Sequence, residues 1–232
     1  MDLQISYEYG QSINYNQIRE YLIQGDFIIC IHDFPLLEEE LTKFVEQIGH
    51  PILERKNNKG QAVFDVKVST HNNAFLSIAN SNLAFPLHTD CADFESIPNC
   101  IGLLCVEPDS SGQGENTFTL LKDVLDYLPN QELNKFLNKK WNFRKYSRSI
   151  LSINDLITSI CYDRITIESF SEVSLVERKE LDKLDRIFKD LSFKKALNKG
   201  DLILFRNDRL LHGRDGFDRD SNRLVKRIRF NL

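Results

Sequence analysis

Two histidines and one aspartate are placed in the sequence so that a fold could gather them around one metal ion. His88 and Asp90 are two residues apart in the segment 85–90, and alternate residues of a strand face the same side. His212 comes much later, in the segment 210–214 that follows an apolar run. Two imidazoles and one carboxylate on one side of an ion leave coordination positions open, as in non-haem Fe(II) sites. We therefore predict a metal site formed by His88, Asp90 and His212, although a His-x-Asp pair alone is more often structural.

An arginine-rich segment follows His212 closely. In a strand over 224–230, Arg227 and Arg229 share one face, and Arg223 lies on the same face just before it. A guanidinium that faces the interior of a barrel is costly to bury unless it meets an anion, and its planar fork suits a carboxylate. We predict that Arg223 binds a dicarboxylate near the metal. A charged edge strand that faces solvent is the alternative.

A glycine-containing turn precedes a possible second ligand for that anion. Gly112 and Gly114 suit a tight turn, and a predicted strand over 117–121 begins at Thr117. The Thr117 hydroxyl can donate a hydrogen bond to the carboxylate that Arg223 binds. An ordinary turn before a strand is the alternative that these residues leave open.

The elements that must position these residues are mostly short strands. Apolar, β-branched and aromatic runs predict strands over 27–31, 62–68, 75–79, 100–106, 117–121, 165–167, 202–205 and 224–230. Apolar residues at helical spacing predict helices over 15–24, between Pro35 and Gly49, and over 175–191. Many short strands with a few peripheral helices predict a mainly β fold, a sandwich or barrel decorated by helices.

The length of 232 residues suits one domain with a sizeable core. No internal repeat, low-complexity tract or long linker divides the chain, so we predict a single domain over 1–232. The stretch 139–173 has weak periodicity and many Ser and Asn residues. We interpret it as a long insertion, and such insertions often act as lids.

Composition and charge argue against some partners and compartments. The net charge of −4 gives no electrostatic reason to bind nucleic acid or an anionic membrane. The five cysteines are odd in number and form no CxxC pair, which disfavours a disulfide framework and fits a reducing cytosol. We see no signal peptide and no apolar run near the roughly 20 residues of a membrane helix. We therefore expect a cytoplasmic protein.

Together these segments resemble the taurine dioxygenase/clavaminate synthase/γ-butyrobetaine hydroxylase superfamily of Fe(II)/2-oxoglutarate oxygenases. The resemblance covers roughly residues 75–232. Its motifs are Pro86-Leu87-His88-Thr89-Asp90, Gly114-Glu115-Asn116-Thr117, Leu210-Leu211-His212-Gly213-Arg214, and the pair Arg223 and Arg227. Two departures matter: the Gly-Gly-Asp-Thr turn of the family reads Gly-Glu-Asn-Thr here, and the chain is shorter than many members.

The resemblance implies a double-stranded β-helix (jelly-roll) core and Fe(II) bound by His88, Asp90 and His212. It implies that 2-oxoglutarate chelates the iron through its keto-acid end, while Arg223 and Thr117 hold the far carboxylate. O₂ is the other co-substrate, succinate and CO₂ are released, and hydroxylation of a C–H bond is the usual outcome. The carboxylate of Asp90 disfavours halogenation, because related halogenases have a small residue at this position.

The resemblance also bears on the substrate, which we expect to be a small molecule. Arg227 matches a position that meets the acidic group of the substrate in taurine dioxygenase-like members. Asn82 and Asp93 flank the metal motif and are candidate substrate-binding residues, and an acidic side chain suits an amine. We therefore predict an amino acid or a derivative as substrate, with a solvated loop as the alternative role for the flanking residues.

Two other functions remain open from the sequence. A cupin-like metalloenzyme that does not use 2-oxoglutarate needs the three metal ligands but gives Arg223 no role. A non-catalytic jelly-roll binding protein would keep the metal site for stability alone. The sequence does not indicate an oligomeric state.

Overall fold

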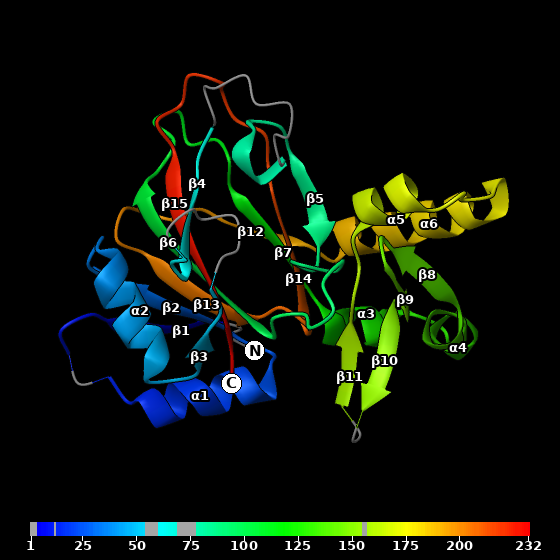
Figure 1. Cartoon of the computed structure of the whole chain (residues 1–232), viewed down its shortest axis with the longest axis horizontal. Helices are drawn as coiled ribbons and strands as arrows, with labels where there is room; N and C mark the ends of the chain where they lie inside the picture. Colours follow the sequence, from blue (N-terminus) through cyan, green and yellow to red (C-terminus); the bar gives the residue numbers. More distant parts are fainter. Residues whose placement is uncertain (1–3, 12, 54–59, 69–77, 155–156) are drawn as a thin grey trace.

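The computed structural model describes residues 4–11, 13–53, 60–68, 78–154 and 157–232, and two sheets form its centre (Figure 1). The larger sheet has the order β1 (Gln4–Glu8), β2 (Ile28–His32), β13 (Leu202–Arg206), β6 (Cys100–Glu107), β15 (Leu224–Asn231) and β3 (His50–Pro51), and β4 (Val63–Val66) also pairs with β15. The smaller sheet has the order β12 (Phe193–Lys195), β7 (Asn116–Leu120), β14 (Leu210–Arg214) and β5 (Phe85–His88). Only β1 and β2 pair in parallel within these two sheets of the described chain.

The central strands of the larger sheet are buried on both faces, which explains their continuous apolar runs. Along β13, Ile203 and Phe205 point into the space between the two sheets, where they join Phe118 of the smaller sheet. Leu202 and Leu204 point to the outer face, where helices cover them. The mainly β fold with peripheral helices is confirmed, and the two packed, mostly antiparallel sheets form the expected double-stranded β-helix.

Helices cover the outer faces of both sheets (Figure 1). The helices α1 (Tyr15–Gln24) and α2 (Glu38–Glu46) pack on the larger sheet through one apolar cluster. The first of them begins at the N-cap Asn14 and ends at Gly25, whose φ of 81° is left-handed, as in many helix termini. Four more helices lie beside the smaller sheet: α3 (Leu121–Tyr127), α4 (Asn130–Asn138), α5 (Arg164–Phe170) and α6 (Leu175–Asp190). Among the described residues no helix is long and apolar enough to cross a membrane.

Two of the predicted strands are wrong where the structure describes them. The segment 165–167 lies in α5, because the Asp163 side chain accepts hydrogen bonds from the N–H groups of Ile165 and Thr166 and so starts a helix. The segment Ile78–Asn80 is a 3₁₀ helix, η1, so the end of the predicted strand 75–79 is also wrong. Residues 75–77 lie outside the described part of the chain.

The stretch 139–173 contains more regular structure than its sequence predicts. It forms the hairpin of β8 (Lys140–Phe143) and β9 (Tyr146–Ser149), the hairpin of β10 (Leu151–Asn154) and β11 (Ile157–Ile160), and α5. Its buried residues, Trp141 and Tyr162 among them, share a core with α3, α4 and α6. Residues 155–156 lie outside the described chain, and the role of this stretch as a lid stays a prediction.

The strands β5 and β14 approach each other closely at Gly213. A Cβ atom at this position would lie 2.7 Å from the carbonyl oxygen of Phe85 and 3.1 Å from the backbone nitrogen of Leu87. The strand register also shifts here, between His212 and Arg214. Glycine at position 213 therefore allows His212 to sit directly across from its partner on β5.

We expect the Gly213→Ala substitution to destabilise the protein by roughly 1–3 kcal/mol, the usual effect of overpacking. The added methyl group must push β5 away from β14, so the midpoint of urea unfolding should fall. Gly216→Ala is the control, because a Cβ atom there meets its nearest atom at 3.4 Å, an ordinary contact. Equal unfolding midpoints for the two variants would show that the strands tolerate the side chain.

Candidate active site

The two histidines of the predicted metal site lie side by side in the smaller sheet. His88, the last residue of β5, is paired with His212 of β14, and the ring centroids are 4.4 Å apart. The ring of Phe85 stacks on His88 at 3.9 Å. The Nδ1 atom of His88 lies 2.9 Å from the carbonyl oxygen of Pro86, so this nitrogen carries the proton and leaves Nε2 available as a ligand.

Asp90 follows β5 in a turn that is fixed through its backbone. Its N–H donates to Oδ1 of Asn207 at 2.8 Å, and its carbonyl oxygen accepts from Nδ2 of the same side chain at 3.0 Å. Asn207 is fully buried and also donates to the carbonyl oxygen of Pro98 at 2.8 Å. The next residue, Cys91, has a left-handed φ of 59°. Asn207 thus anchors the metal motif to the loop between β13 and β14, a role that the sequence analysis missed.

The carboxylate of Asp90 is buried and balanced by two arginines. Arg229 forms a two-point contact, with Nε 2.9 Å from Oδ2 and Nη2 2.9 Å from Oδ1, and Nη1 of Arg227 lies 3.2 Å from Oδ2. Burial alone would raise the pKa of Asp90, but Arg227 and Arg229 outweigh it and hold this pKa well below its usual value. Asp90 is therefore ionised at neutral pH.

The protonation states of these groups fit a divalent metal ion. Burial, together with the neighbouring His88, holds the pKa of His212 well below its usual value, so its imidazole is neutral. The buried Nδ1 atom of His212 has no hydrogen-bond partner among the described residues. A metal needs neutral imidazoles and an ionised carboxylate, and one carboxylate with two imidazoles is the donor set of non-haem iron. The residue types therefore fit Fe(II), but the structure does not bring the three ligand atoms together. Both oxygens of Asp90 face Arg229, and among the described residues only Cys30, His32 and Asp201 have ligand atoms that all lie within 4.8 Å of one another.

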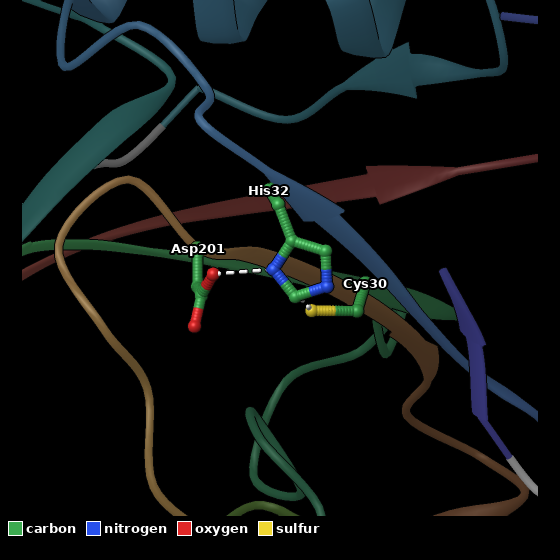
Figure 2. A group of neighbouring side chains, drawn as sticks. All are labelled: Cys30, His32 and Asp201. Atoms are coloured by element: carbon green, nitrogen blue, oxygen red, sulfur yellow. Dashed lines mark hydrogen bonds and ion pairs between the residues drawn. The ribbon is translucent and has the colours of Figure 1, made fainter. Parts of the chain in front are cut away.

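A second group of metal-ligating residue types lies in the larger sheet. Cys30, His32 and Asp201 have ligand atoms that all lie within 4.8 Å of one another (Figure 2). However, Nδ1 of His32 and Oδ1 of Asp201 are only 2.7 Å apart, whereas two ligands that bind one ion at about 2.0–2.1 Å lie roughly 3 Å or more from each other. Burial also raises the pKa of Cys30 to about 11. We interpret this group as a hydrogen-bonded structural pair beside a protonated thiol.

A cavity beside the histidines is lined by His88, His212, Arg223 and Arg227 and extends from the smaller to the larger sheet. We call it the Arg223 cavity. Arg223 is only 6% exposed, and in the described part of the chain no carboxylate forms a salt bridge with it. Burial lowers the pKa of Arg223, because no paired anion offsets the loss of hydration. This cation therefore faces a cavity that suits an acidic ligand.

Gly114 makes room for that arginine. Its φ of 70° is left-handed, and a Cβ atom there would lie 3.1 Å from Cδ and from Nε of Arg223. Gly112 also has a left-handed φ, of 72°. The predicted turn at these glycines is confirmed, and it adjoins the guanidinium.

Thr117 does not line the Arg223 cavity, whereas its neighbour Asn116 does. Along β7, Asn116 and Phe118 face the inside of the sandwich, since Phe118 packs in the core between the sheets. Thr117 and Thr119 face the opposite side, where the Thr119 hydroxyl donates to the carbonyl oxygen of Phe188 in α6 at 2.8 Å. The strand begins at Asn116, one residue earlier than predicted, and the pairing of Phe118 with His212 and of Asn116 with Arg214 places the even-numbered residues on the inner face.

A second cavity adjoins the first and contains the charged residues of the metal motif. It is lined by His88, Asp90, Asp93, Asp163, Arg227 and Arg229, among others, and we call it the Asp90 cavity. Arg227 and His88 line both cavities. Asp93, a predicted substrate-binding residue, lies on the wall of this cavity and forms an ion pair with Arg144 at 3.5 Å. Asp163, at the start of α5, was not predicted.

Asn82 has a different position from the one predicted for a pocket residue. Its side-chain Nδ2 donates to the backbone carbonyl oxygen of Phe217 at 3.1 Å. Its backbone carbonyl oxygen accepts from the N–H of Phe217 at 3.0 Å. Arg214 supports the same loop by donating to the carbonyl oxygens of Ser81 and Leu83, each at 2.8 Å. Asn82 thus fastens the loop before β5 and lines neither of the two cavities.

Solved structures with the same fold include three non-haem iron oxygenases. Asparagine oxygenase in complex with Fe(II), (2S,3S)-3-hydroxyasparagine and succinate is 17% identical, with a TM-score of 0.74 over 94% of this chain and 79% of its own. OrfP in complex with Fe, succinate and (3R,4R)-dihydroxy-L-Arg is 15% identical, with a TM-score of 0.72 over 94% and 80%. PvcB, an Fe, α-ketoglutarate-dependent oxygenase from an isonitrile synthetic pathway, is 17% identical, with a TM-score of 0.75 over 99% and 85%. At these identities the likeness establishes the fold.

Sequence comparison establishes the family. No curated protein sequence matches this chain. The profile of the "Taurine catabolism dioxygenase TauD, TfdA family" matches residues 2–166 and 167–229. These ranges cover nearly the whole chain and include the residues that line both cavities. Because the match covers nearly the whole chain, the protein belongs to the TauD/TfdA family of dioxygenases.

Proposed function

We propose that this protein is an Fe(II)- and 2-oxoglutarate-dependent oxygenase that hydroxylates a small amino-acid-like substrate. The reaction converts R–H, 2-oxoglutarate and O₂ into R–OH, succinate and CO₂. One observation carries the proposal: a buried Arg223 without a salt bridge in the described chain lines the same cavity as the neighbouring imidazoles of His88 and His212. Family membership supports the same reaction class.

The metal would be held by His88, Asp90 and His212, as the sequence predicts. Bound iron supplies a Lewis-acidic centre where the keto acid and O₂ react. The protein keeps Asp90 ionised through the arginines of β15 and keeps His212 neutral through burial. Phe85 stacks on one face of His88 and limits the rotation of that ring.

The co-substrate would lie in the Arg223 cavity with its far carboxylate on the guanidinium of Arg223. Asn116 takes the place that the sequence analysis gave to Thr117, because its side chain lines this cavity and its amide can donate to a carboxylate. An arginine fork and an amide on neighbouring walls suit a dicarboxylic acid.

The substrate would lie in the Asp90 cavity, where opposite charges face each other. Arg227 can receive a carboxylate, and Asp93 and Asp163 can receive an amino group. A free amino acid carries both groups. Structural neighbours with the same fold hold 3-hydroxyasparagine and dihydroxy-arginine, which supports an amino acid or a derivative here.

The alternative functions explain fewer of these features. A cupin-like enzyme that does not use 2-oxoglutarate gives no reason to bury Arg223 beside the histidines. A jelly-roll protein that keeps a metal only for stability gives no reason for a second charged cavity at Asp90.

Anaerobic addition of Fe(II) and 2-oxoglutarate should produce a metal-to-ligand charge-transfer band, and O₂ should then release succinate. His212→Ala should abolish the band, because one of three metal ligands is lost. His50→Ala is the control, since His50 is exposed on β3. Folded wild-type protein that gives neither band nor succinate would contradict the proposed function.

Asn116→Ala should weaken 2-oxoglutarate binding by roughly ten- to a hundredfold, because a hydrogen bond to a charged group contributes about 1.5–3 kcal/mol. Titration of the anaerobic charge-transfer band measures this affinity. Thr117→Ala is the matched control and should leave it unchanged, since Thr117 faces away from the cavity. The reverse pattern would restore Thr117 as the ligand and refute the assignment of Asn116.

Asp93→Asn should raise the KM of the best amino-acid substrate roughly tenfold, because a charge-assisted hydrogen bond to its amine is weakened. Succinate release across the standard amino acids identifies that substrate, and the variant is then compared at fixed 2-oxoglutarate. Asp126→Asn, at an exposed position of α3, is the control. An unchanged KM would place the amine elsewhere, with Asp163 as the next residue to replace.

A further inference from the structure

We infer that Arg144 is a specificity-determining residue of the substrate site and favours amino acids that carry an acidic group in the side chain. The inference rests on the proposed function and adds to it a residue to which the sequence analysis gave no role. Arg144 lies at the tip of the hairpin that β8 and β9 form. Nη1 of its guanidinium lies 3.5 Å from Oδ2 of Asp93, and Asp93 lines the Asp90 cavity.

The hairpin is fastened to the wall of that cavity. At its base, Trp141 and Phe143 of β8 are buried in the core that α3, α4 and α6 share. On β9, Nη2 of Arg148 donates to the backbone carbonyl oxygen of Phe94 and, at 3.1 Å, to that of Glu95. Because Phe94 lines the Asp90 cavity next to Asp93, β9 holds the loop that forms this part of the wall and keeps the hairpin tip beside it.

The direction of the Arg144 side chain is set by a tight turn and by an aromatic ring. Arg144 has a left-handed φ of 60°, as two-residue hairpin turns commonly require. Its guanidinium carbon lies 5.7 Å from the centroid of the Phe170 ring, within the range of a cation–π contact. Phe170 is the last residue of α5, which packs next to β8 (Figure 1). The guanidinium thus lies between α5 and the carboxylate of Asp93.

The ion pair between Arg144 and Asp93 does little to stabilise the fold. The side chain of Arg144 is 58% exposed and that of Asp93 is 25% exposed, and exposed ion pairs contribute little to stability. The separation of 3.5 Å is also longer than the roughly 2.7–2.9 Å of a charge-assisted hydrogen bond. A loose pair of this kind can admit a third charged group, so we interpret it as part of the substrate site.

Asp93 is better placed than Asp163 to receive the amino group of a substrate. The side chain of Asp163 caps α5: Oδ1 accepts from the N–H groups of Ile165 and Thr166, and Oδ2 accepts from the Thr166 hydroxyl at 2.6 Å. Oδ1 of Asp93, in contrast, has no hydrogen-bond partner among the residues that the structure describes. An amine bound to Oδ1 of Asp93 leaves Arg144 in place at Oδ2.

The charges around the cavity then predict the side chain of the substrate. An amino acid with its α-carboxylate on Arg227 and its amine on Asp93 has both of its main-chain charges balanced. The amine also takes up the negative charge that Asp93 offers to Arg144, so the positive charge of Arg144 is left unbalanced next to the ligand. A carboxylate on the substrate side chain restores the balance there, whereas an ammonium or guanidinium group is repelled.

The test compares pairs of amino acids that differ in one charge: L-aspartate with L-asparagine, and L-glutamate with L-glutamine. Succinate release by protein supplied with Fe(II) and 2-oxoglutarate gives kcat/KM for each. The wild type should prefer the acidic member of at least one pair. Arg144→Gln should reduce that preference roughly two- to fivefold, the range of exposed ion pairs, and should do so through KM. Lys145→Gln is the matched control, because it removes the same charge from the same turn and Lys145 forms no ion pair in the described chain.

Arg144→Glu gives a readout that a failure to fold cannot imitate. Reversal of the charge should raise kcat/KM for L-lysine while it lowers kcat/KM for the acidic amino acids, whereas a damaged fold lowers all of them. Added salt should also weaken the preference of the wild type, because salt screens charges at the protein surface. Thermal unfolding of each variant should match that of the wild type, since the ion pair is exposed.

Failure of the inference can be told apart from failure of the proposed function. Folded wild-type protein that releases no succinate with any amino acid overturns both. If the wild type does release succinate, but shows no preference for an acidic member of either pair, the role of Arg144 alone is refuted. The same conclusion follows if Arg144→Gln keeps the preference, or if Lys145→Gln loses it to the same extent.

Discussion

The site depends on the burial of charge inside a β-sandwich. Ionised groups lose hydration in such a place and persist only where opposite charges or hydrogen bonds replace the water. Asp90 meets this condition through Arg227 and Arg229. Arg223 is also buried, but in the described chain it has no salt bridge and lies beside the ring of Phe217, with its guanidinium carbon 5.5 Å from the ring centroid. The two sets of charged groups therefore differ in how far their charge is balanced within the protein.

β15 provides Arg227 and Arg229, and Arg223 lies directly before it. Strand alternation explains how these charged residues can occur without disrupting the place of the strand in the sheet. On the outer face of β15, Ile228 and Phe230 belong to the apolar cluster beneath α1 and α2. On the inner face, Val225 packs in the core between the sheets, and Arg223, Arg227 and Arg229 line the cavities. The outer face stabilises the strand through apolar packing, so the charged residues of the inner face can line the cavities.

The sequence was sufficient for the features that depend on residue type and short spacing. The i, i+2 spacing of His88 and Asp90 predicts that they lie close together, and the structure places both on the wall of one cavity. The period of two likewise placed Arg227 and Arg229 on one face of β15. Residue types were less informative where local capping decides the structure: the β-branched run 165–167 reads as a strand, yet Asp163 starts a helix there. Asn207 and Arg229 act through partners more than a hundred residues away, and one sequence alone gives no sign of such pairs.

Positions 116 and 117 show most clearly what the sequence alone cannot predict. A motif gives spacing in residues, but a strand assigns alternate residues to opposite faces, so an error of one position reverses the assignment completely. The pairing of Asn116 with Arg214 and of Phe118 with His212 settles which residues face inward, because Phe118 packs in the core between the sheets. The register of β7 against β14 is a property of the folded sheet, and it is the register, more than the identity of the threonine, that decides which side chain lines the Arg223 cavity.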